Sequence, residues 1–68
     1  MTFEQWYEKV NIEFIAYTGL DRDSWADGLY WDMWNDGLTP LEAVATVIND
    51  EYGVEAIEAF GLEHVEVY

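Results

Sequence analysis

Almost all the side chains that could do chemistry in this chain are carboxylates. Fifteen of its 68 residues are Asp or Glu, against only Lys9 and Arg22, so the formal net charge is -13 at pH 7. Carboxylates can ligate cations, work as acid and base pairs, or bind a positively charged partner. There is no cysteine, which excludes disulfides and thiolate chemistry. The candidate functions are therefore those that carboxylates can perform.

The segment DRDSWADG, residues 21–28, comes nearest to a metal-binding motif. A calcium loop of the EF-hand type needs oxygen ligands at its first, third and fifth positions and a glycine at the sixth. Asp21 and Asp23 fit this pattern, but Trp25 takes the fifth position and Gly28 comes two residues late. We therefore expect no metal site and no cofactor, and the alternative is a cation held loosely among Asp21, Asp23 and Asp27.

No spacing in the sequence indicates a catalytic site. A hydrolytic carboxylate pair needs one desolvated and one ionised acid around a cleft, for which so short a chain has little room. The single histidine, His64, lies between Glu63 and Val65 near the end of the chain, and no Ser/His/Asp set or phosphate-binding glycine motif stands out. We expect a protein that is not an enzyme.

The elements that must position these carboxylates are helices. Thr2 and Thr39 are each followed three residues later by Gln or Glu, and these capping boxes predict helix starts directly after them. Apolar residues then recur at spacings of three and four, and a glycine follows each run. The predicted helices cover residues 3–18, 29–35 and 40–52, with a fourth candidate over 54–60.

The chain is predicted to form one all-α domain, residues 1–68, around an aromatic core. Twelve aromatic residues can bury a large area in a short chain. Ile12, Ile15 and Ala16 widen the apolar stripe of the first helix, which should be covered on more than one side. The tail, residues 62–68, alternates like an extended strand but has no partner strand. It could be a loose arm, a strand added to another protein's sheet, or a dimer contact.

The net charge indicates the kind of partner. It exceeds the magnitude of about 2 to 8 that suffices for solubility in a small domain, and the self-repulsion destabilises the compact state. Nucleic acid and anionic membranes are polyanions and are excluded as direct partners. No apolar run approaches the roughly 20 residues of a membrane span, and we expect a cytoplasmic protein. A basic protein surface remains as the attractive partner.

Carboxylates on a rigid scaffold resemble the regularly spaced charges of a phosphate backbone, so the chain could occupy the basic groove of a nucleic-acid-binding protein. The alternative is a solvated surface on a chain that is simply acidic. An exposed tryptophan among the acids would anchor the contact. The predicted partner-binding residues are Glu4, Glu8, Asp21, Asp23, Trp25, Asp27, Asp32 and Asp36.

Two segments, TFEQWYEKVNIEFIAYTGL and YWDMWNDGLTPLEAVATVI, carry an aromatic-rich turn and a DGLTPLEA helix corner. In these features the chain resembles a group of short, acidic, largely uncharacterised proteins encoded by tailed bacteriophages. The resemblance implies a non-enzymatic phage protein in the host bacterial cytoplasm that inhibits host machinery handling nucleic acid. The competing interpretation is a small structural or regulatory module, a monomer or homodimer, that binds through exposed aromatics and the C-terminal arm.

Overall fold

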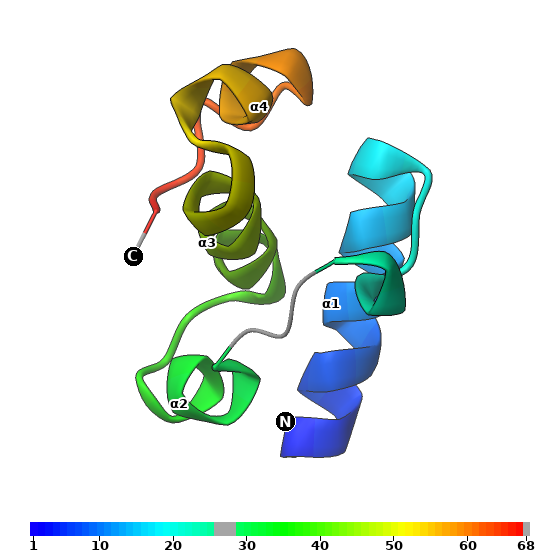
Figure 1. Cartoon of the computed structure of the whole chain (residues 1–68). Helices are drawn as coiled ribbons and strands as arrows, with labels where there is room; N and C mark the ends of the chain where they lie inside the picture. Colours follow the sequence, from blue (N-terminus) through cyan, green and yellow to red (C-terminus); the bar gives the residue numbers. More distant parts are fainter. Residues whose placement is uncertain (26–28, 68) are drawn as a thin grey trace.

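Four α-helices make up the fold in the computed structural model, which describes residues 1–25 and 29–67 (Figure 1). They are α1 (Phe3–Thr18), α2 (Tyr30–Asn35), α3 (Pro40–Tyr52) and α4 (Val54–Ala59). A short 3-10 helix, η1 (Arg22–Ser24), lies between α1 and α2. These described residues form no strand, and the prediction of an all-α fold is confirmed.

The two longest helices begin at capping boxes. The Thr2 hydroxyl accepts a hydrogen bond from the backbone N–H of Gln5 at 3.2 Å, and the Gln5 side chain accepts one from the Thr2 N–H at 3.1 Å. Thr39 and Glu42 repeat the arrangement at 3.2 and 2.7 Å at the start of α3. Each box satisfies two backbone donors that a helix start leaves open. The starts of α1 and α3 are therefore set by local sequence.

The corner between α2 and α3 is a Schellman motif. The N–H of Leu38 donates to the carbonyl of Met33 at 3.1 Å, and the N–H of Gly37 donates to the carbonyl of Trp34 at 3.1 Å. Gly37 has a φ of +83°, a left-handed conformation that glycine adopts without the penalty of a Cβ atom. Leu38 and Met33 are both buried. The corner thus folds the chain back onto its own core.

The tail begins with the same motif. The N–H of Leu62 donates to the carbonyl of Ile57 at 2.9 Å, and both side chains are buried. The N–H of Val65 then donates to the carbonyl of Leu62 at 3.0 Å, which closes a turn. The tail is therefore anchored at Leu62, and residues 63–65 form turns or bends before the last described residues, 66 and 67. The strand-like alternation read from the sequence does not produce a strand up to residue 67.

Helix α3 lies at the centre of the fold, with α1 along one side and α4 packed at its C-terminal end (Figure 1). Residues 43–48 of α3 are all buried. Helix α1 packs against α3 through Trp6, Val10 and Phe14, which are buried as the apolar spacing predicted. A single contiguous core is the result.

The outer side of α1 differs from the prediction. Ile12 is 58% exposed, and Ile15 and Ala16 are exposed as well. The sequence suggested that these residues widen the buried stripe, and this was wrong. The reason is geometric, because α2, α3 and η1 pack against α1 and leave these three residues in water.

A long-range hydrogen bond joins α1 to the corner before α3. The indole N–H of Trp6 donates to the backbone carbonyl of Leu38 at 2.8 Å, and both residues are buried. A buried carbonyl that loses its donor keeps the cost of its desolvation. This bond therefore fixes where α2 and the start of α3 sit against α1.

We predict that Trp6→Phe lowers the free energy of unfolding by about 1 to 3 kcal/mol, since it removes the donor to Leu38 and part of the buried ring. The measurement is urea denaturation followed by circular dichroism. Trp31→Phe is the matched control, because it makes the same chemical change at an exposed position. It should change the unfolding free energy by less than about 0.5 kcal/mol. Equal effects of the two variants would contradict the assigned role of the Trp6 hydrogen bond.

Candidate functional site

The carboxylates of the described residues lie at the surface. Twelve of these fourteen side chains are exposed, and the other two, Glu13 and Glu42, are half-buried. Glu42 is the residue that completes the capping box of α3. The negative charge of the chain is therefore presented to solvent.

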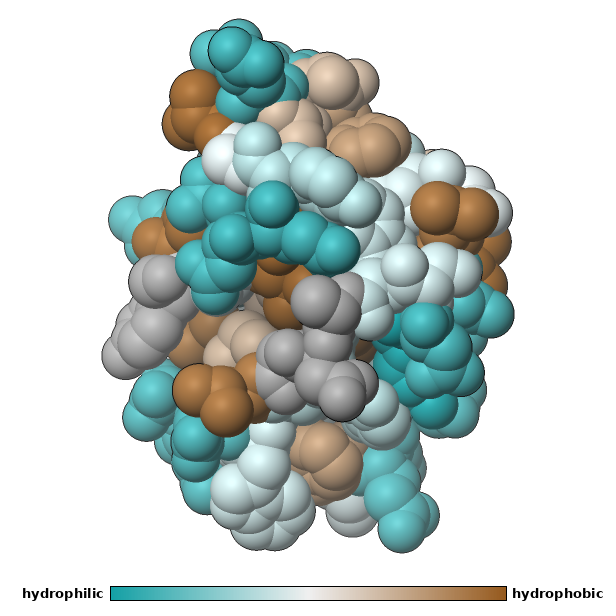
Figure 2. Space-filling view, in the orientation of Figure 1, coloured by the Kyte–Doolittle hydropathy of each residue, from teal (hydrophilic) through white to brown (hydrophobic). Residues whose placement is uncertain are grey.

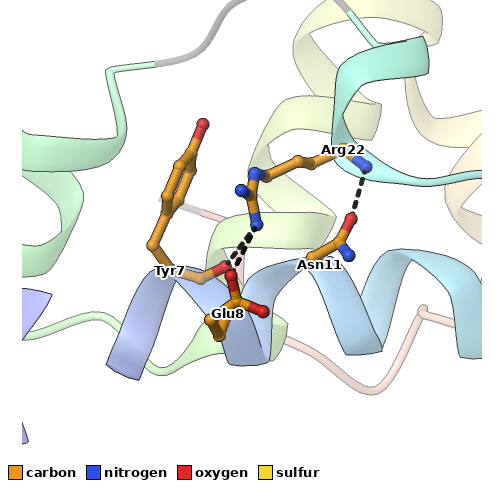
Figure 3. Close-up of polar contacts among 4 residues, drawn as sticks. All are labelled: Tyr7, Glu8, Asn11 and Arg22. Carbon is orange, nitrogen blue, oxygen red and sulfur yellow. Dashed lines mark hydrogen bonds and ion pairs between the residues drawn. The ribbon is translucent and has the colours of Figure 1, made fainter. Parts of the chain in front are cut away.

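The single arginine is used inside the fold (Figure 3). The Arg22 side chain is only 20% exposed, and its guanidinium carbon lies 3.8 Å from the centre of the Tyr7 ring. Its Nη1 donates to the backbone carbonyl of Tyr7 at 3.2 Å and lies 4.0 Å from a carboxylate oxygen of Glu8. The backbone N–H of Arg22 also donates to the side-chain oxygen of Asn11 at 2.9 Å. These contacts hold η1 against the middle of α1.

The predicted binding acids form two groups. Glu8 is brought to η1 by its contact with Arg22, and η1 carries Asp23 and is preceded by Asp21. The second group consists of Glu4 in the first turn of α1, Asp32 in α2 and Asp36 at the C-terminal cap of α2.

Asp27 lies outside the described residues. In Figure 2 the hydrophilic side chains on the visible face form separate groups, with apolar side chains between them. Outside the grey residues, the hydrophilic side chains on this face do not join into one continuous area.

Trp25 is buried, and the prediction that it is an exposed anchor was wrong. It is 9% exposed, stacks on Phe14 with ring centres 5.5 Å apart, and meets the edges of Tyr52 and Phe60 at 5.6 and 6.1 Å. The contacts of η1 with α1 bring the loop back over the core, so the ring fills the space between α1 and the α3–α4 end. Trp25 therefore has a structural role.

The exposed tryptophan is Trp31. It is 56% exposed and contacts Phe3 and Trp34, with ring centres 5.1 Å away in both cases. We call Phe3, Trp31 and Trp34 the aromatic patch. Exposed Glu4 and Asp32 are the residues next in sequence after Phe3 and Trp31.

A sequence signal for Trp31 was available. Tyr30 and Met33 are three residues apart and both are buried, so they define the inner side of the short helix α2. Trp31, one residue after Tyr30, is rotated about 100° from it and turns outward. The positions of Tyr30 and Met33 in this helix therefore indicate which of its rings is exposed.

The described part of the chain offers little else that could form a site. No three Asp, Glu or His side chains in residues 1–25 and 29–67 come together to hold a metal ion. No helix among these residues is both long and apolar enough to cross a bilayer. The chain matches no protein-family model, and searches of curated proteins and of solved structures find no match. The carboxylate surface and the aromatic patch remain as the candidate site.

We predict that Arg22→Ala lowers the free energy of unfolding by about 1 to 3 kcal/mol, because it removes a ring contact and a hydrogen bond that hold η1 on α1. Thermal and urea unfolding would measure this. Lys9→Ala is the control, since it removes the same charge from an exposed position of α1 and should have an effect below about 0.5 kcal/mol. If both variants lose equal stability, overall charge and not the Arg22 contacts is responsible.

Proposed function

We propose that this protein is a non-enzymatic, phage-type inhibitor that binds a basic, nucleic-acid-handling protein in the host bacterial cytoplasm. It would present carboxylates where nucleic acid presents phosphates. The observation that carries the proposal is that nearly all the exposed charged side chains of the described residues are carboxylates. All fourteen described carboxylates reach solvent, while Arg22 is held against Tyr7 and Glu8.

The physical basis is electrostatic attraction between opposite surfaces. A body with a formal charge of -13 and dimensions of 31 × 21 × 19 Å has a strong negative field. Such a field speeds the encounter with a positively charged groove and repels nucleic acid. The attraction is screened over roughly 10 Å at 0.1 M salt, so the strength of binding should depend steeply on ionic strength.

We predict that the immobilised protein retains basic nucleic-acid-binding proteins from a bacterial lysate, and that both salt and duplex DNA release them. Raising salt from about 50 mM to about 500 mM should weaken the purified interaction at least about tenfold. Calorimetry with the captured protein would measure the dissociation constant. An interaction that neither salt nor DNA competes with would refute mimicry of nucleic-acid charge.

A charge-matched pair of variants locates the binding surface. Glu4→Gln, Asp23→Asn and Asp32→Asn together neutralise three predicted binding residues, and the interaction should weaken about fivefold to thirtyfold. The control neutralises three exposed acids at the other end of the chain, Glu55, Glu58 and Glu63. It removes as many negative charges as the first variant does. If both triple variants weaken binding to the same degree, only total charge matters and the named residues form no site.

A second candidate function is a small interaction module that forms a homodimer, and one observation favours it. The exposed Ile12 and Ile15 lie on the outer side of α1, and exposed Leu20 follows that helix. Residues 14–20 contain no charged side chain. Two acidic copies could approach along this stretch with less repulsion than elsewhere, and burying the exposed apolar side chains would favour their association.

The homodimer predicts that association strengthens as salt rises, whereas binding to a basic partner is predicted to weaken. Screening of the self-repulsion between copies should strengthen dimerisation as salt rises, and Ile12→Glu should weaken it at least about tenfold. Sedimentation equilibrium over a range of salt would measure the dimer fraction. Val54→Glu is the control, because Val54 is 65% exposed on another helix. A chain that stays monomeric at every salt concentration excludes the homodimer.

A further inference from the structure

The aromatic patch places its most exposed ring at Trp31. Among the tryptophans, Trp6 and Trp25 are buried and Trp34 is half-buried. Trp is enriched among the residues that carry most of the energy of protein interfaces, because it buries a large area with few rotatable bonds. Trp31 is therefore the tryptophan of the described residues best placed to contact a partner.

The rings of the patch are held in place before any partner arrives. Phe3 and Trp34 both contact Trp31, and they also contact each other with ring centres 5.7 Å apart. Three mutual contacts restrict the rotamers of all three side chains. A partner that binds Trp31 consequently loses little affinity to the ordering of this surface.

The neighbouring ring shows which cation suits this surface. Phe3 stacks on Tyr7 with ring centres 5.3 Å apart and an angle of 16°. Tyr7 is the ring that Arg22 covers, with the Glu8 carboxylate 4.0 Å from the guanidinium (Figure 3). The same row of rings therefore carries the chain's own arginine at Tyr7 and reaches the surface at Trp31.

The exposed end lies on a chain with a formal net charge of -13. Glu4 follows Phe3, and Asp32 follows Trp31, and both carboxylates are exposed. The chain has no second arginine to cover these rings. A ring beside carboxylates attracts a cation through both the ring quadrupole and the opposite charge. The charge of the patch is thus complementary to a basic side chain of a partner.

We infer that the aromatic patch binds an arginine side chain of a basic partner protein in preference to lysine. This inference rests on the proposed function, since it names the side chain that the acidic surface receives. A guanidinium is planar and weakly hydrated, so it stacks on an indole and still donates to a carboxylate in its own plane. An ammonium group is compact and strongly hydrated, and loses more hydration when it leaves water for a ring face.

The test compares short arginine and lysine homopeptides of equal length and charge, with binding measured by calorimetry at low salt. The arginine peptide should bind about threefold to tenfold more tightly. Trp31→Ala should remove this preference and leave the two peptides with similar affinity. Trp31→Phe, which keeps a ring, should retain part of it, and circular dichroism verifies that each variant is folded.

Val54→Ala is the matched control, because it shortens an apolar side chain of similar exposure on α4, and it should leave the preference unchanged. Equal binding of both peptides, or a preference that survives in Trp31→Ala, overturns the inference. If both peptides bind equally and salt weakens both, the charge-based function stands and only the arginine assignment fails. If neither peptide binds, attraction to basic partners fails as well.

Discussion

The hydrogen bond from the indole of Trp6 to the carbonyl of Leu38 holds together the two parts of the chain that carry the aromatic patch, α1 and the corner after α2. Helix α2 has only six residues, too few for a stable helix in isolation. Its position depends on the corner that follows it, and this bond attaches the corner to α1. Phe3 comes from α1, whereas Trp31 and Trp34 come from α2, so the aromatic patch exists only because these helices are held together.

Local patterns in the sequence were sufficient for the helices and insufficient for the surface. Thr2 and Thr39 with their partners set the helix starts through contacts three residues apart, and such contacts can be read directly. The burial of Trp25 depends on Phe14, Tyr52 and Phe60, which come from three other parts of the chain. No local spacing encodes that contact. The outer isoleucines of α1 were misjudged for the same reason, because exposure depends on which neighbours arrive.

The same difference between local patterns and contacts of distant residues applies to the candidate site. The positions of the acids on their helices could be derived from the sequence, since a charged side chain without a partner stays in water. Their grouping could not, because the attachment of η1 through Arg22 brings Glu8 beside that segment. The sequence named Trp25 as the anchor for its acidic neighbours, but the ring contacts of the folded chain favour Trp31.

The buried segment of α3, residues 43–48, contains no ionisable side chain, whereas every described acid lies outside it. The fold is thus specified by one set of positions and the electrostatic character by another. Substitutions that redistribute carboxylates over the outer helices need not disturb the central packing. A scaffold divided in this way can change the charge pattern of its surface through mutation and selection while keeping the same architecture.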